Sequence, residues 1–153
     1  MKRILVSACL LGLPCRYDGR SRPHAVMQTL LDTEGIEWIP FCPEQAGGLP
    51  TPRPASEVCG MRVINCEGLD VTDAYRRGAE GALTLCRLFS VDLAVLKERS
   101  PSCGSGEIYD GSFRRKLIEG DGITTRLLRE NGIPVMGESQ ISLDFLKQFV
   151  YKR

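Results

Sequence analysis

Three cysteines of this chain, Cys9, Cys42 and Cys103, lie in stretches rich in Gly and Pro, where thiolates could bind a metal ion or a cluster. Glycine lets backbone amides approach a bound anion closely, and amides near a thiolate or sulfide stabilise its charge. The chain has seven cysteines in all. An odd count without a recognisable signal peptide argues against a disulfide framework. Buried thiols, a metal site, an iron–sulfur cluster or a catalytic thiolate therefore remain.

The other four cysteines carry weaker signals. Cys86 falls inside a predicted helix and is expected in the core, and Cys59 and Cys66 flank a predicted strand and are expected to be inert thiols. Cys15 lies in the loop that follows Cys9, so it could be a fourth ligand, a proton donor or a bystander. Histidine-rich metal chemistry is excluded because the chain has one His.

Short apolar runs and the periodicity between them predict the elements that must position these cysteines. Strands are expected at 2–8, 37–41, 92–97 and 134–136, and helices at 23–35, 72–89, 123–130 and 143–150. Strands that alternate with helices predict an α/β fold: an open, mostly parallel, Rossmann-like sheet with helices on both faces.

The regions between these elements predict a loop and two small β features. Four Pro and two Gly in 42–54 predict a structured loop. Short strands are expected at 61–65 and 69–71 around a turn at Glu67-Gly68. A small β-flap is expected at 108–117, with its turn at Asp110-Gly111.

The positions of the three cysteines relative to the strands are the most informative feature. Cys9 ends the first strand, Cys42 ends the second, and Cys103 lies just past the third. All carboxyl ends of a parallel sheet lie along one edge, where such folds bind ligands. One strand-end cysteine is most often a small buried hydrophobe. Three at one edge, each in a Gly- or Pro-containing loop, predict a shared site.

Composition narrows the class of protein. A chain of 153 residues with 42% hydrophobic residues predicts one domain that spans 1–153. The net charge of +1 gives no global attraction to nucleic acid or anionic membranes. No apolar run approaches the roughly 18–20 residues that span a bilayer, and the apolar N-terminal stretch is too short for a signal peptide. We therefore expect a cytoplasmic protein with no membrane partner, and the oligomeric state is not predicted.

Six short motifs occupy 7–12, 15–19, 41–53, 96–97, 100–104 and 108–113. Together they resemble the thiouracil desulfidase family, formerly catalogued as a domain of unknown function. The similarity extends from the first strand to about Glu138, and the combination is specific although each motif alone is weak.

The resemblance implies a [4Fe–4S] cluster with Cys9, Cys42 and Cys103 as ligands and one open iron. It also implies the non-redox removal of sulfur from a thiolated pyrimidine, such as a 2-thiouracil-like base or nucleoside. Glu44 would be the acid/base, with Ser102 or Ser100 as a helper. A soft thiocarbonyl sulfur would bind the open iron, and water deprotonated by Glu44 would attack the carbon as sulfide leaves.

The substrate is expected to be a small thiopyrimidine, and a tRNA substrate is disfavoured because the chain lacks the second domain of tRNA-linked relatives. Tyr17 could stack on the pyrimidine ring, and Arg16, Arg53 or Lys97 could bind its oxygen or a phosphate. The same residues could instead be a core tyrosine and surface charges.

Two alternatives stay open at this point. The first is a structural or sensory cluster or zinc module without turnover, with Cys15 as the fourth ligand. The second is a metal-free thiol enzyme with a nucleophilic cysteine, for which the sequence offers no obvious base.

Overall fold

The architecture is a parallel sheet of four strands, seen in a computed structural model that describes residues 1–21 and 23–152. Arg22, in the predicted loop after Cys9, and Arg153, the last residue of the predicted domain, lie outside the described residues. The strand order is β2-β1-β5-β8, and every neighbouring pair is parallel. The strands are β1 (Lys2–Ser7), β2 (Ile36–Phe41), β5 (Leu93–Leu96) and β8 (Val135–Gly137).

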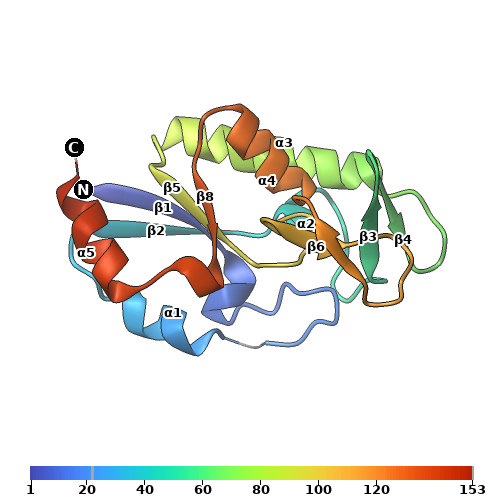
Figure 1. The fold of residues 1–153 in the computed structure, drawn as a ribbon, viewed down its shortest axis with the longest axis horizontal. Coiled ribbons are helices and arrows are strands. Elements are labelled where there is room, and N and C mark those ends of the chain that lie inside the picture. Colours follow the sequence, from blue (N-terminus) through green and yellow to red (C-terminus); the bar gives the residue numbers. More distant parts are fainter. Residues whose placement is uncertain (22, 153) are drawn as a thin grey trace.

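Helices cover both faces of this sheet (Figure 1), which confirms the predicted fold class. Alternate residues of β1 show the two faces: Ile4 and Val6 pack in one core with residues of α1 and α5, and Leu5 packs in the other with residues of α3 and α4. Each such fully buried aliphatic side chain contributes about 1.5–3 kcal/mol. The helices are α1 (Ala25–Leu30), α3 (Thr72–Leu88), α4 (Ile123–Glu130) and α5 (Leu143–Tyr151).

Two antiparallel ribbons lie beyond the carboxyl ends of the parallel strands (Figure 1). The pair β6 (Glu107–Tyr109) and β7 (Leu117–Glu119) forms the predicted flap, although its connection is longer than the expected turn. The other pair differs from the prediction. Strand β4 (Arg62–Asn65) pairs with the unpredicted β3 (Ser56–Cys59), and the expected strand at 69–71 contributes only a single bridge from Asp70 to Ile64.

The remaining differences from the prediction are in the short helices. The expected loop 42–54 contains a short helix, α2 (Pro43–Ala46), because Pro43 is pre-organised for the first helical position. Helix α1 begins at Ala25 rather than Pro23 and ends at Leu30, well before Gly35. Short 3₁₀ helices, η1 (Ala8–Leu11) and η2 (Glu138–Gln140), follow β1 and β8.

Helices α2 and α3 pack so closely that each requires a glycine at the contact. A Cβ on Gly78 of α3 would overlap the carbonyl oxygen of Pro43, and a Cβ on Gly47 would overlap that of Ala74. Neither glycine has a positive φ, so the requirement is space. This contact fixes α2, and with it the first residues after β2, against the rest of the fold. Within the described part of the chain, no helix is long and apolar enough to cross a membrane.

Candidate functional site

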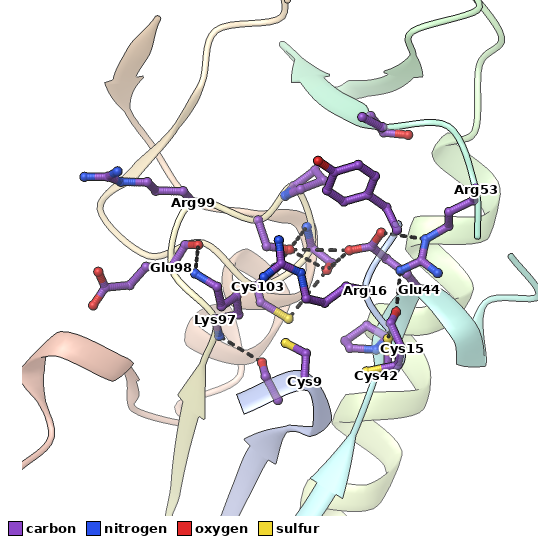
Figure 2. Close-up of a pocket in the computed structure, with 18 of the residues that line it drawn as sticks. Cys9, Cys15, Arg16, Cys42, Glu44, Arg53, Lys97, Glu98, Arg99 and Cys103 are labelled. Carbon is purple, nitrogen blue, oxygen red and sulfur yellow. Dashed lines mark hydrogen bonds and ion pairs between the residues drawn. The ribbon is translucent and has the colours of Figure 1, made fainter. Parts of the chain in front are cut away.

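A cavity of about 540 Å³ opens at the carboxyl edge of the sheet. It is lined by the segments that follow β1, β2 and β5, together with parts of β3 and of the flap. Cys9, Cys42 and Cys103 all line it, each from a different segment (Figure 2). The three predicted cysteines are therefore brought together by three neighbouring strands, in the order β2, β1 and β5.

Local structure holds each cysteine in place. Cys9 lies in η1, directly after β1. Cys42 caps the N-terminus of α2. Cys103 lies in a loop that its own polar groups close, because its N–H donates to Ser100 Oγ at 3.1 Å and the next N–H, of Gly104, donates to the Ser100 carbonyl at 2.8 Å. The Cys103 side chain is buried.

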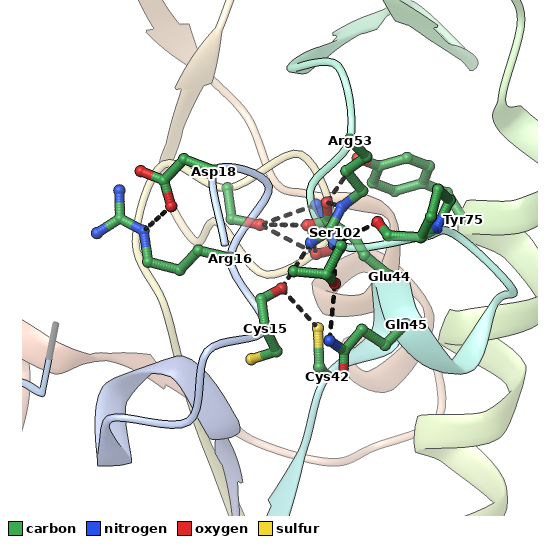
Figure 3. Close-up of polar contacts among 12 residues, drawn as sticks. Cys15, Arg16, Asp18, Cys42, Glu44, Gln45, Arg53, Tyr75 and Ser102 are labelled. Atoms are coloured by element: carbon green, nitrogen blue, oxygen red, sulfur yellow. Dashed lines mark hydrogen bonds and ion pairs between the residues drawn. The ribbon is translucent and has the colours of Figure 1, made fainter. Parts of the chain in front are cut away.

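A fourth cysteine, Cys15, reaches the same cavity and is buried. It lies near Cys42 and Cys9, and the three thiols influence one another's acidity. Its carbonyl accepts a hydrogen bond from Arg53 Nη2 at 2.8 Å, and Cys42 Sγ lies 3.7 Å from that oxygen (Figure 3). Cys15 therefore lies beside two of the three predicted ligands, close enough to be considered as a fourth.

The cysteines differ in acidity. The hydrogen bond from Cys15 lowers the pKa of Cys42 to about 7 and also lowers the pKa of Cys9. The same two hydrogen bonds, to Cys42 and then Cys9, raise the pKa of Cys15. Burial raises the pKa of Cys103 to about 12, against smaller opposing effects of Ser102 and Ser7. In the absence of a bound cation, the site therefore favours thiolates at Cys42 and Cys9 over Cys103 and Cys15.

The donor set fits an iron–sulfur cluster better than a single metal ion. Among residues 1–21 and 23–152, no group of three or more His, Cys, Asp or Glu side chains is placed to hold one ion. Zinc requires all its ligand atoms within about 2.0–2.3 Å. A cluster distributes its thiolate ligands over several irons, so the thiols stand further apart around a larger volume. Three cysteines around one cavity match that requirement.

Glu44, from α2, lies at the centre of a polar network in the same cavity. Its Oε1 accepts hydrogen bonds from Arg53 Nε at 3.1 Å and from the Tyr75 hydroxyl at 2.9 Å. Its Oε2 accepts one from Ser102 Oγ at 2.8 Å and a longer one from Ser100 Oγ at 3.4 Å (Figure 3). The carboxylate is thus held on both sides, and it faces the loop that carries Cys103.

The two serines connect Glu44 to the cysteine site. Ser102 Oγ lies 3.5 Å from Cys103 Sγ and 3.0 Å from Ser100 Oγ. Ser102 is almost fully buried. The predicted acid/base, its predicted helpers and one predicted ligand therefore form one continuous set of contacts.

The predicted substrate-binding residues all line the cavity, but they differ in exposure and in ion pairing. Tyr17 exposes 45% of its surface, so its ring is free to meet a ligand. Arg16 lies near its neighbour Asp18, with Nε 3.6 Å from the carboxylate. Lys97 Nζ is ion-paired with the buried Glu138 at 2.9 Å. Arg53 is buried and bound to Glu44, so it belongs to the wall of the site.

Known proteins are similar to this chain over most of its length. The model of the 2-thiouracil desulfurase family matches residues 4–140, which include every cysteine of the cavity. The chain belongs to the 2-thiouracil desulfurase family. The resemblance recognised from the sequence motifs is thereby confirmed.

Two relatives of this desulfurase family member span nearly its whole length. A solved structure described as a [4Fe–4S]-dependent thiouracil desulfidase, TudS (DUF523Vcz), is 50% identical, with a TM-score of 0.88 and 98% of both chains covered. Uncharacterized protein YbbK of Bacillus subtilis (strain 168) is 37% identical over 149 residues, which cover 91% of this chain and 97% of the relative.

Sequence patterns missed several residues of this desulfurase site. Tyr75 lies within a predicted helix whose apolar spacing gave no sign that a hydroxyl reaches Glu44. Arg99, Phe113 and Arg115 line the cavity with positive φ values of 66°, 59° and 57°. A positive φ is uncommon for residues other than glycine, and the residue types at these positions do not predict it.

Proposed function

We propose that this protein replaces the sulfur of a thiolated pyrimidine by oxygen. In the overall reaction, C=S and water become C=O and hydrogen sulfide, so atoms balance and no electrons are exchanged. The observation that carries this proposal is the meeting of three strand-end thiols with the Glu44 carboxylate in one cavity. Membership of the 2-thiouracil desulfurase family supports the same reaction.

Cys9, Cys42 and Cys103 would be the ligands of a [4Fe–4S] cluster in this cavity. The 50% identical solved structure, described as [4Fe–4S]-dependent, supports this cofactor. When bound through three cysteines, such a cluster would supply an open iron, a Lewis acid that attracts the soft thiocarbonyl sulfur. We leave Cys15 out of the ligand set because a fourth thiolate would close that position.

Glu44 would remove the proton from the attacking water. Its Oε2 lies on the side of the Cys103 loop, where Ser102 donates to it at 2.8 Å. A water that replaced or joined this serine contact would stand beside both the carboxylate and Cys103, since Ser102 Oγ is 3.5 Å from Cys103 Sγ. General-base catalysis of this kind contributes about 10²–10⁴-fold. Ser102 and Ser100 would orient the water and the pyrimidine.

The pyrimidine would be held at the open side of the cavity. Tyr17 offers an exposed ring for stacking, and Arg16 and Lys97 also line the cavity, where they would meet an oxygen of the ring or of an attached group. A cavity of about 540 Å³ accommodates a base or nucleoside beside a cluster. Free 2-thiouracil-like bases and their nucleosides are therefore the proposed substrates.

One observation favours a second candidate, a cluster-binding module without turnover. Cys15 lines the cavity together with Cys9, Cys42 and Cys103, and its carbonyl oxygen lies 3.7 Å from Cys42 Sγ, so a fourth cysteine ligand is within reach of the site. Four cysteines would close the cluster. Such a protein would contain as much iron as a desulfidase, but it would release no sulfide from 2-thiouracil.

Turnover with product identification tests the proposed function. The full chain is reconstituted with iron and sulfide without oxygen, desalted and incubated with 2-thiouracil. The expected result is uracil and sulfide in equal amounts over many turnovers, with no added reductant. Untreated apoprotein serves as the control and is expected to be inactive. Iron-loaded protein that leaves 2-thiouracil and its nucleoside unchanged would refute the proposal and favour the binding module.

A further inference from the structure

The two oxygens of Glu44 have different surroundings. Oε1 is bound by the wall of the cavity, through Arg53 Nε at 3.1 Å and the Tyr75 hydroxyl at 2.9 Å. Within residues 1–21 and 23–152, Oε2 accepts hydrogen bonds from serine hydroxyls alone, those of Ser102 and Ser100, on the side of Cys103. A carboxylate with one oxygen tied by two donors can turn little about its last torsion. Its other oxygen is therefore aimed in a fixed direction.

Tyr75 is placed to act as a permanent donor to this carboxylate. It lies near the start of α3 and exposes only 1% of its surface, so no water competes for its hydroxyl. Burial, and then the charge of Glu44, raise the pKa of Tyr75 well above its usual range, so its proton stays in place. A phenylalanine would fill the same space, and the hydroxyl is therefore not needed for packing.

Arg53 alone does not fix the orientation of Glu44. Its guanidinium also binds the carbonyl oxygens of Cys15 and Pro50, and it lies 4% exposed beneath them. These contacts place the guanidinium, but one hydrogen bond from Nε leaves the Glu44 carboxylate free to rotate about that contact. The second donor, from a different element, removes this freedom.

We propose that Tyr75 is a positioning residue, which, together with Arg53, fixes Oε1 of Glu44 and so aims Oε2 at the reacting water. This inference rests on the proposed function, because it assigns an oxygen to the acid/base step of that reaction. It predicts that Tyr75 affects the rate of the chemical step and not the binding of the cluster or of the substrate. Misorientation of a catalytic group typically costs about 10–100-fold in rate.

The test measures Tyr75→Phe in the full, anaerobically reconstituted protein. We expect kcat to fall at least about tenfold while KM changes less than about twofold, with iron content and Tm as in the unchanged chain. Thr84→Val is the matched control, since it removes a hydroxyl from the same helix, one that donates to the Glu80 carbonyl oxygen at 2.9 Å within that helix. It is expected to keep full turnover.

Two further variants make the result specific to Glu44. Tyr75→p-aminophenylalanine retains the ring and an N–H donor, so its turnover should be higher than that of Tyr75→Phe. Turnover is expressed per iron, so that the comparison holds even if Tyr75→Phe binds less iron. Glu44→Asp has a shorter side chain, which withdraws the carboxylate from the Tyr75 hydroxyl. Tyr75→Phe should therefore cause no further loss of turnover when it is added to Glu44→Asp.

Full turnover by Tyr75→Phe, no recovery with the amino variant, or an equal loss in both backgrounds would overturn the inference. The proposed function fails in a different way. If Glu44→Gln retains full turnover, Glu44 is not the acid/base. If Glu44→Gln is inactive while Tyr75→Phe is fully active, the positioning role of Tyr75 is refuted and the proposed role of Glu44 is not.

Discussion

Single residues carry the chemistry, and their types were the part of the site most visible in the sequence. Cys9, Cys42 and Cys103 could be placed at one edge because each follows a strand, and strand direction alone fixes that edge. Glu44 and the serines came from a family resemblance. Tyr75 could not be found in this way, because its contact with Glu44 depends on how α3 packs against α2, which no local pattern encodes.

Replacement of the proposed base tests chemistry at this scale. Glu44→Gln keeps an acceptor for Arg53 and Tyr75 and leaves the fold intact, but it removes the oxygen that takes up a proton. We expect kcat to fall by at least about 100-fold with iron content unchanged. Sulfide release and iron analysis on the same sample measure both. Turnover within about threefold of the unchanged chain would mean that another group is the base.

Elements decide where those residues point. Loop 42–54 was predicted from its prolines and glycines, and the prediction missed α2 because the same Pro that breaks a helix interior begins a helix at its first turn. This short helix carries Glu44, and Cys42 caps it. The close contact of α2 with α3 through Gly47 and Gly78 holds both residues against the sheet edge.

The contact of α2 with α3 can be disturbed without a change to any residue of the site. Gly78→Ala places a methyl group on the Pro43 carbonyl oxygen, so α2 must move. We expect a loss of about 1–3 kcal/mol in unfolding free energy, together with lower turnover per iron. Urea denaturation and sulfide release measure the two effects.

Gly81→Ala is the control for that substitution, since its methyl group would meet only the end of the Phe41 side chain. It is expected to keep turnover. Equal turnover in Gly78→Ala and Gly81→Ala would show that the position of α2 does not matter for the site.

The whole molecule is an open parallel sheet with a core on each face, and this architecture was predictable from alternating apolar runs and helices. The order β2-β1-β5 brings three cysteine-bearing segments side by side. The pairing of β3 with β4 was not predictable, because 56–59 lacks a strong strand pattern and its partner is decided by packing on α3.

A cluster that links the segments after three strands should stabilise the whole fold. Ligands that bind only the native state raise its stability, and the cysteines of the unfolded chain cannot form this site. We expect anaerobic reconstitution to raise Tm by at least about 4 °C. Calorimetry of holoprotein and apoprotein measures the shift. Identical Tm values at full iron loading would mean that the cluster is not bound across these segments.

The number of cysteines that bind the cluster decides between an enzyme and a closed binding module. The most direct measurement is iron content together with sulfide release from 2-thiouracil in Cys15→Ala and Cys9→Ala, each reconstituted without oxygen. Three-cysteine ligation predicts that Cys15→Ala keeps about four irons per chain and its turnover, while Cys9→Ala loses both. Loss of the cluster from Cys15→Ala, to the same extent as from Cys9→Ala, would contradict an open iron and with it the proposed desulfuration.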